Sequence, residues 1–226
     1  MQIDILSLFP NYFTGPFDES IIKQARKKGI LTINLIDIRT FADNRHRKVD
    51  DRSYGGGPGM VMMPQPAVNA IRSVKKPGAK VIYLSPQGHP LTASKCRELA
   101  QHEHLILLCG HYEGIDERIL DEVDEEISIG DYVLTNGCLS AIVLVDAMVR
   151  FVPEVLGHEC AANEDSFENG LLDYPHYTRP EIFEDKEVPA VLLSGDHKKI
   201  AEWRRKKALK KTQRVRPDLW QKLYRT

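Results

Sequence analysis

Strand-like and helix-like segments alternate over the first two-thirds of this chain, and this alternation restricts its fold most. The apolar runs Lys80–Leu84 and Leu105–Cys109 have the length and composition of strands buried in a parallel sheet, and Thr92–Gln101 between them has a helical pattern with Thr92 as its cap. We therefore expect an α/β fold with a mostly parallel sheet. Further strands are expected over Ile3–Phe9 and Leu31–Ile38, and further helices over Asp18–Lys28 (with Asp18 or Ser20 near its start and Gly29 after its end), Leu139–Phe151, Asp196–Lys211 and Pro217–Leu223.

Two stretches break this rhythm and suggest the domain boundaries. Asp43–Gln65 is a long loop with the glycine-rich run YGGGPGM, and loops of this length inside a compact domain are usually functional or disordered. Gly157–Ser166 is small and polar, and prolines punctuate the segment that follows it. We expect an α/β domain over residues 1–156, a linker over 157–166 and a small helical domain over 167–226.

Charge is distributed unevenly along the chain. The formal net charge is −1, yet the segment from Lys198 to Arg225 holds twelve Lys or Arg residues against two acidic residues, Glu202 and Asp218. A basic region on a nearly neutral protein indicates a polyanionic partner such as nucleic acid, and the alternative interpretation is a solvated helix face.

Composition excludes several classes of protein. A chain that is 42% hydrophobic and 28% charged is expected to be globular and not disordered. Its longest apolar run, around Ala141–Val145, is interrupted by Asp146 and falls short of the ~18–20 residues that span a bilayer, so we expect no membrane segment. The four cysteines have no paired spacing and the N-terminus has no secretory pattern, so we expect a cytoplasmic protein with reduced thiols.

Several common site motifs are absent. The glycines of Gly55–Gly59 could let backbone amides approach a ligand, but no Gly-Lys-Ser/Thr follows, and the run does not tightly join a strand to a helix as dinucleotide sites require. Two His/Cys sets match no zinc pattern, so we expect no bound metal. These sets are His102, His104, Cys109 and His111, and the tripeptide His158-Glu159-Cys160. No motif indicates a covalent nucleophile.

Glycine-containing loops follow three of the apolar runs. They read YLSPQG (Tyr83–Gly88), CGHYEG (Cys109–Gly114) and SIGDYVLTNG (Ser128–Gly137). Ligands of open α/β sheets bind outside the carboxyl ends of the strands, where such loops converge. Any one of these loops could be an ordinary turn, but three in succession predict a small-molecule pocket that includes Tyr112 and Tyr132.

Longer segments carry patterns that are peculiar to one family. They are DDRSYGGGPGM, YLSPQG, CGHYEGIDER, SIGDYVL, VLGHE…EDSF and LLDYPHYTRP…VPAVLLSGDH, and together they extend almost from end to end. In these segments the chain resembles the bacterial tRNA (guanine-N(1))-methyltransferase family, TrmD, of the SPOUT class. The resemblance implies a homodimer, an α/β domain with a deep trefoil knot, S-adenosylmethionine as methyl donor and Mg²⁺ as a further candidate. It also implies a tRNA substrate with a guanosine just 3′ of the anticodon, preceded by another guanosine.

Residue roles follow from the same resemblance. Asp165, by match to EDSF, would be the general base that removes the N(1) proton of guanine, and Arg150 would stabilise the negative charge that develops on O6. Asp165 would reach the pocket from the partner subunit, and Glu113 would orient the methionine amine or Mg²⁺. The cofactor loops Tyr83–Gln87, Gly110–Gly114 and Ile129–Ser140 would contribute Tyr83, Leu84, Pro86, Gln87, Gly110, Tyr112, Glu113, Gly114, Ile129, Gly130, Asp131, Tyr132, Val133, Leu134, Asn136, Gly137 and Ser140.

Each of these roles has a structural alternative. Asp165 could cap a helix, Arg150 at the end of an apolar helix suits the helix dipole, and Tyr112 could fill core. The aromatic residues of the basic region, Trp203, Trp220 and Tyr224, are expected to be core residues more than stacking platforms.

The chain departs from the family pattern at the third loop. Asn136-Gly137-Cys138-Leu139-Ser140 stands where the family has two glycines followed by Glu-Leu-Pro, and His111 stands where it has Arg. Asn can adopt the left-handed conformation, though less freely than Gly.

Two hypotheses therefore compete with an active enzyme of this family. One is a related SPOUT enzyme that acts on another RNA, which the EDSF segment and helical tail disfavour; the other is an RNA-binding protein whose altered loop no longer binds S-adenosylmethionine.

Overall fold

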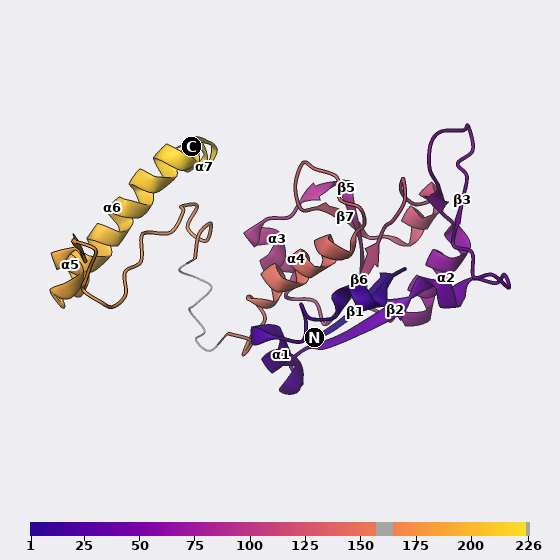
Figure 1. Cartoon of the computed structure of the whole chain (residues 1–226), viewed down its shortest axis with the longest axis horizontal. Helices are drawn as coiled ribbons and strands as arrows, with labels where there is room; N and C mark the ends of the chain where they lie inside the picture. Colours follow the sequence, from indigo (N-terminus) through magenta and orange to yellow (C-terminus); the bar gives the residue numbers. More distant parts are fainter. Residues whose placement is uncertain (157–164, 225–226) are drawn as a thin grey trace. The chain divides into compact units, whose positions relative to one another are not determined.

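The computed structural model describes residues 1–156 and 165–224, and the chain divides into two compact units, Met1–Glu159 and Cys160–Thr226 (Figure 1). The first is termed the α/β unit and the second the helical unit. The expected linker, 157–166, lies mostly outside the described residues.

The α/β unit is built on one five-stranded sheet in which every pairing is parallel, as the alternation of segments predicts. The strand order is β2-β1-β6-β5-β7. The strands are β1 (Gln2–Ser7), β2 (Thr32–Asp37), β5 (Lys80–Pro90), β6 (His104–Cys109) and β7 (Glu125–Ser128).

Helices cover both faces of this sheet. Ile82 and Leu84 of β5 pack into an apolar cluster with α1, α3 and α4, whereas Val81 and Tyr83 pack into a second cluster with α2. Strands buried on both faces are typical of parallel sheets, which explains their nearly continuous apolar runs. The helices are α1 (Ser20–Lys27), α2 (Pro64–Val74), α3 (Ala93–Leu99) and α4 (Cys138–Val149), and the short 3-10 turns are η1 (Pro10–Phe13), η2 (Ile38–Phe41) and η3 (Glu117–Glu122).

The helix-end signals were correct for α3 and for the end of α1. The Thr92 hydroxyl accepts a backbone N–H of the first turn of α3 at 3.2 Å. Gly29 follows α1 at φ +73°, a conformation that suits glycine. The expected start of α1 is confirmed, because Ser20 is its first residue. No side chain caps this end, and the Asp18 carboxylate instead accepts a bond from the Arg26 guanidinium at 2.6 Å.

The segment 43–65 has more structure than the sequence predicts. β3 (Asp50–Asp51) and β4 (Val61–Met62) form an antiparallel pair, and the glycine run Gly55–Gly59 lies between them. α2 begins at Pro64 and was not predicted, although proline suits the first turn of a helix. Its buried face is made of small residues and one isoleucine, which gave little periodic signal.

The helical unit contains both predicted helices. α6 (His197–Val215) extends beyond the predicted end, and the Asp196 carboxylate caps it by accepting the Lys199 N–H at 3.1 Å. α7 (Pro217–Tyr224) follows directly. The proline-rich segment before α6 forms a short hairpin and one helical turn, which the sequence analysis did not predict. These are β8 (Ile182–Phe183), β9 (Lys186–Glu187) and α5 (Ala190–Leu193).

In the helical unit, the buried Thr212 hydroxyl makes two hydrogen bonds, one of which connects α6 to the segment before the hairpin. Thr212 of α6 donates to the Ala208 carbonyl at 2.9 Å and accepts the Leu172 N–H at 2.8 Å, so it ties the segment before the hairpin to the helix. Trp203 and Trp220 are half-buried, intermediate between the core and surface alternatives. The Tyr224 side chain lies outside the description. None of the described helices is long and apolar enough to span a membrane.

Candidate active site

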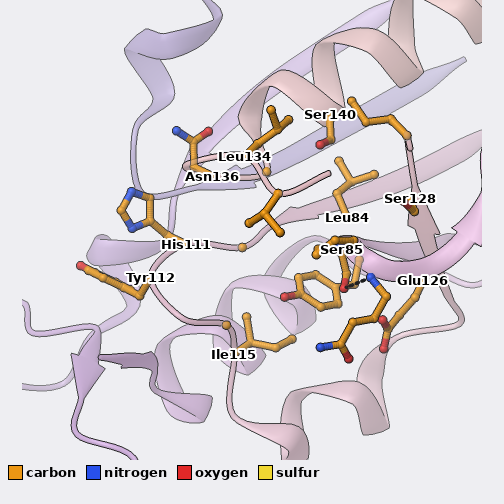
Figure 2. A pocket seen from close by; sticks show the side chains of 18 of the residues that line it. Leu84, Ser85, His111, Tyr112, Ile115, Glu126, Ser128, Leu134, Asn136 and Ser140 are labelled. Carbon is orange, nitrogen blue, oxygen red and sulfur yellow. Dashed lines mark hydrogen bonds between the residues drawn. The ribbon is translucent and has the colours of Figure 1, made fainter. Parts of the chain in front are cut away.

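The three glycine-containing loops enclose one cavity of about 230 Å³ (Figure 2). They follow β5, β6 and β7, which are neighbours in a parallel sheet, so their carboxyl ends lie at the same edge. The prediction that these loops converge on one pocket is confirmed.

Of the residues named from the resemblance for the cofactor, all but Asp131 line this cavity. Further residues line the cavity that were not predicted to do so. Three of these, Ser85, His111 and Thr135, fall inside the predicted loops, whereas Glu117 and Leu120 come from η3. The full set of additional lining residues is Ser85, His111, Ile115, Glu117, Leu120, Glu126, Ser128 and Thr135.

Two glycines of these loops are required by close backbone contacts. A Cβ atom at Gly88 would lie 2.4 Å from the Ile127 nitrogen of β7. A Cβ at Gly137 would lie 2.9 Å from the Gly110 nitrogen, and the Gly137 N–H donates to the Gly110 carbonyl at 2.8 Å. Any side chain at either position would push two backbones apart, which explains the glycines of YLSPQG and SIGDYVLTNG.

In the third loop, two residues that depart from the family pattern make hydrogen bonds. The Asn136 carboxamide oxygen accepts the Cys138 N–H at 2.8 Å, at the start of α4, and Asn136 does not need the left-handed conformation. The Cys138 thiol lies 3.1 Å from the Ser7 hydroxyl, and its hydrogen bond with Cys109, followed by that with Ser7, lowers its pKa to about 7. At these two departures, Asn136 therefore bonds within the loop, whereas the Cys138 thiol bonds to β1 and β6.

Three aromatic rings, those of Phe9, His111 and Tyr112, pack together at one side of the cavity. The His111 ring lies 5.1 Å from the Phe9 ring and 4.5 Å from the Tyr112 ring, and Tyr112 adopts φ +62°. Tyr112 points away from the centre of the cavity, and its hydroxyl donates to the Asp50 carboxylate at 3.2 Å (Figure 2). Burial, and then the positive charge of Arg39, lower the pKa of His111, so the neutral ring is favoured at this position.

The cavity is electrostatically negative. Glu113, Glu117 and Glu126 line it, and no Lys or Arg is found among its described lining residues. Burial, and then the charge of Glu126, raise the pKa of Tyr83 to about 12. The site therefore favours a cationic ligand and disfavours a phosphate. Glu113 also lies against Gly59 of the glycine-rich run, where a Cβ atom would lie 2.6 Å from a Glu113 carboxylate oxygen and where the φ of +78° suits glycine.

No three His, Cys, Asp or Glu side chains gather as a metal site in the described part of the chain, so Mg²⁺ has no support. His104 Nε2 lies 2.7 Å from the Asp4 carboxylate, and Cys109 shares a hydrogen bond with Cys138. The tripeptide at 158–160 lies outside the described residues.

The two residues expected to perform catalysis belong to different units. Arg150 is the C-cap of α4, where its charge suits the helix dipole, and it does not line the cavity. Asp165 borders a second cavity, of about 660 Å³, within the helical unit, which Arg204 and Arg205 also line. Residues 165–170 form turns, so Asp165 does not cap a helix.

Comparison with known proteins gives one consistent result. A family model described as tRNA (Guanine-1)-methyltransferase TrmD matches residues 1–222. A protein named tRNA (guanine-N(1)-)-methyltransferase from Protochlamydia amoebophila (strain UWE25) is 73% identical over 220 residues, which cover 97% of this chain and 99% of that protein. Proteins with the same name from Chlamydia muridarum and Chlamydia trachomatis serovar D are 59% and 58% identical over 97% of this chain, which spans 62% of their length. The chain therefore belongs to the tRNA (guanine-1)-methyltransferase TrmD family.

Proposed function

We propose that this protein transfers a methyl group from S-adenosylmethionine to N(1) of the guanosine immediately 3′ of a tRNA anticodon, in the cytoplasm. Family membership and the names of the relatives support the activity. The observation that supports the cofactor is the negatively charged cavity that three sheet-edge loops enclose.

The fit of the cofactor rests on charge. S-adenosylmethionine carries a sulfonium and an ammonium cation and one carboxylate, so it is a net cation, and the described cavity offers three carboxylates without a competing Lys or Arg. A nucleotide cofactor with phosphates would meet repulsion at the same place. The trefoil knot that the resemblance implies would place these loops against one another, and the Gly137 N–H, which donates to the Gly110 carbonyl at 2.8 Å, joins two of them.

The proposed chemistry needs one base and one cation from the protein. The N(1) atom of guanine carries a proton, so the Asp165 carboxylate would take that proton while N(1) attacks the methyl carbon. The electrons of the broken carbon–sulfur bond remain on sulfur, and the sulfonium supplies a leaving group that departs neutral and needs no acid. The Arg150 guanidinium would stabilise the negative charge on O6 as the proton leaves.

The position of Arg150 supports a homodimer with a shared active site. Ser140 in the first turn of α4 lines the cavity, whereas Arg150 follows the last turn, about 15 Å along the axis at ~1.5 Å per residue. An arginine side chain does not bridge that distance within its own protomer. α4 is apolar around most of its circumference and leaves Leu139 and Val143 41% and 45% exposed, so we infer that a second copy of the chain covers this face and receives Arg150 and Asp165.

The direct test is methyl transfer from labelled S-adenosylmethionine to unmodified tRNA transcripts, with the product nucleoside identified. We expect 1-methylguanosine only on transcripts with the guanosine 3′ of the anticodon, and a loss of about 10²–10⁴-fold in rate for Asp165→Ala, typical of a removed general base. Glu202→Ala, which removes an exposed acid of α6, is the matched control and should keep full activity.

The second candidate, an RNA-binding protein without methyl transfer, predicts a different result. Folded wild-type protein would then bind tRNA and form no product, and calorimetry would show no heat of S-adenosylmethionine binding. The hydrogen bond that Asn136 makes at the start of α4 favours the active enzyme, because it orders the loop in which the chain departs from the family.

A further inference from the structure

One motif of the sequence has no role in the proposed chemistry. The two halves of LLDYPHYTRP…VPAVLLSGDH are separated by the β8–β9 hairpin, yet both line one cavity of about 430 Å³ in the helical unit. Small-ligand pockets are commonly about 300–1,000 Å³. All described residues that line this cavity belong to the helical unit, and none of them comes from the α/β unit.

Aromatic rings and cations dominate the polar side of this cavity, termed here the aromatic cavity. The Tyr174 ring lies 4.8 Å from the His176 ring, and the Arg204 guanidinium lies 4.8 Å above Tyr174. Tyr177 and Arg179 complete this side, and Tyr177 is 49% exposed. Rings with accessible faces beside arginines are the arrangement that proteins use to stack an unpaired base and hold its phosphate.

The ring system continues outside the cavity along α6. Tyr177 lies 6.3 Å from Trp203, and the Lys207 ammonium lies 5.4 Å above the Trp203 ring. α6 as a whole carries nine Lys or Arg residues and a single acidic residue, Glu202. A free nucleotide would not need this extended basic face, whereas the backbone of an RNA strand would follow it.

Acidic groups at the aromatic cavity are few and have defined places. Asp173 pairs with His176, with 2.7 Å between the carboxylate oxygen and Nε2. Glu181 lines the cavity and offers a carboxylate acceptor for an exocyclic amino group of a base. Glu181 is the one carboxylate among the described lining residues, against the two guanidinium groups of Arg179 and Arg204, so the cavity is not anionic.

We propose that the aromatic cavity binds one unstacked nucleotide of the RNA substrate, with its base on Tyr177 and its phosphate near Arg179 and Arg204. The inference rests on the proposed function for the identity of the RNA as tRNA. It assigns to the motif 171–197 a binding role distinct from the methyl-transfer site.

The test measures the affinity of the full-length chain for an unmodified tRNA transcript over a range of salt concentrations. Tyr177→Ala should weaken binding about 5- to 150-fold, the effect expected of one lost base–aromatic stack. Tyr177→Phe keeps the ring and should bind like wild type. Phe183→Ala removes an exposed ring that lies outside the cavity, on β8, and should also leave affinity unchanged.

The salt dependence separates stacking from damage to the fold. Loss of a stack leaves the phosphate contacts in place, so Tyr177→Ala should keep the slope of log K against log salt. An unfolded helical unit would lose many contacts at once, and the slope would fall. Wild-type affinity in Tyr177→Ala, or an affinity loss that comes with a lower slope, would overturn the proposal.

A second readout uses the two tryptophans. In the Trp220→Phe background Trp203 is the sole tryptophan, and a base entering beside Tyr177 should quench its fluorescence. Unchanged fluorescence at saturating tRNA would contradict the nucleotide site.

Methyl transfer is measured on the same samples to distinguish this inference from the proposed function. If tRNA binding depends on Tyr177 but no methylation occurs, the proposed function alone is rejected. If Tyr177→Ala binds tRNA and methylates it like wild type, this inference alone is rejected.

Discussion

The two units of this chain are stabilised in different ways. In the α/β unit, apolar clusters on both faces of the sheet bury residues such as Ile5, Ile82 and Leu107 completely. In the helical unit, Ala208 and Thr212 are the buried residues among 165–223, and the remainder of that range is half-buried or exposed. A densely packed core holds loops in defined positions, whereas a thin core with a basic helix offers mainly surface.

This difference separates two kinds of contribution to activity. Around the 230 Å³ cavity, backbones approach each other so closely that Gly88 and Gly137 tolerate no side chain. The nine cations of α6 are exposed, and the contacts that some of them make, such as Arg204 over Tyr174 and Lys207 over Trp203, lie near the surface. We therefore expect substitutions in the α/β unit to change cofactor binding steeply, and substitutions in the helical unit to change RNA binding in small, nearly additive steps.

The largest expected effect comes from mixing two inactive variants, one defective in each unit. Gly137→Val blocks the cavity and keeps Asp165, and Asp165→Ala does the reverse. If the base acts on the partner's cavity, mixed dimers hold one complete site of two, and random exchange of subunits should restore about a quarter of wild-type activity. Methyl transfer is measured after co-refolding. A mixture that remains inactive, while size exclusion shows mixed dimers, would mean that each protomer uses its own Asp165.

The next effect concerns the glycine contact alone. Gly137→Ala places a Cβ atom 2.9 Å from the Gly110 nitrogen, so the two loops must separate. The separated loops must return to their positions when the cofactor binds, so the cost of the overpacked contact, about 1–3 kcal/mol, falls on binding and lowers S-adenosylmethionine affinity about 5- to 150-fold by calorimetry. Gly78→Ala is the control, because its φ of +82° strains alanine but no atom lies nearby. It should lower the free energy of unfolding without changing cofactor affinity.

The same difference explains how much the sequence could predict. β5, β6 and the three loops were predictable because burial on both faces leaves continuous apolar runs, and each run ends in glycine-marked loops such as Tyr83–Gly88. α2 escaped prediction because proline and alanine supply much of its buried face, so its apolar period is weak. The β8–β9 hairpin escaped because its four strand residues carry no alternating pattern.

Some features of the site could not be predicted, because they arise from contacts between segments that are distant in the sequence. Glu117 and Leu120 line the cavity from η3, a 3-10 helix, and although Glu117 belongs to the motif CGHYEGIDER, neither residue was predicted to line the pocket. The hydrogen bond from the Cys138 N–H to Asn136 was not predicted, because only the conformational freedom of Asn136 was considered. The roles of Asp165 and Arg150 came from family resemblance alone and stay predictions.

A smaller effect is expected for single cations of α6. Lys206→Ala, Lys210→Ala and Arg214→Ala each remove one exposed charge. Each should weaken tRNA binding several-fold near 0.1 M salt and reduce the slope of log K against log salt by about one if its charge contacts a phosphate. Filter binding at several salt concentrations gives both values. Lys27→Ala removes an exposed cation of α1 and should change neither, and an equal loss there would show that the α/β unit shares the RNA surface.

The smallest expected effect tests whether a titrating group inside the packed unit behaves differently from the permanent charges of α6. Burial and the nearby Arg39 charge lower the pKa of His111, so the folded state favours the neutral ring. The stability that this provides is complete above the unfolded pKa of about 6.5 and is lost as the pH falls toward the lower folded pKa. Wild type should therefore lose more in Tm than His111→Gln between pH 7 and pH 5, by no more than about 2 °C because the ring is partly solvated.

Thermal unfolding of both proteins across that range supplies the measurement. Affinity for tRNA should stay constant between pH 7 and pH 8, since His111 is already neutral there and the Lys and Arg residues of α6 remain charged. An affinity that rises on acidification from pH 8 to pH 7, and that His111→Gln abolishes, would mean that the ring binds RNA in its protonated form. His111 would then belong functionally with the cations of the helical unit, although it is positioned by the core of the other unit.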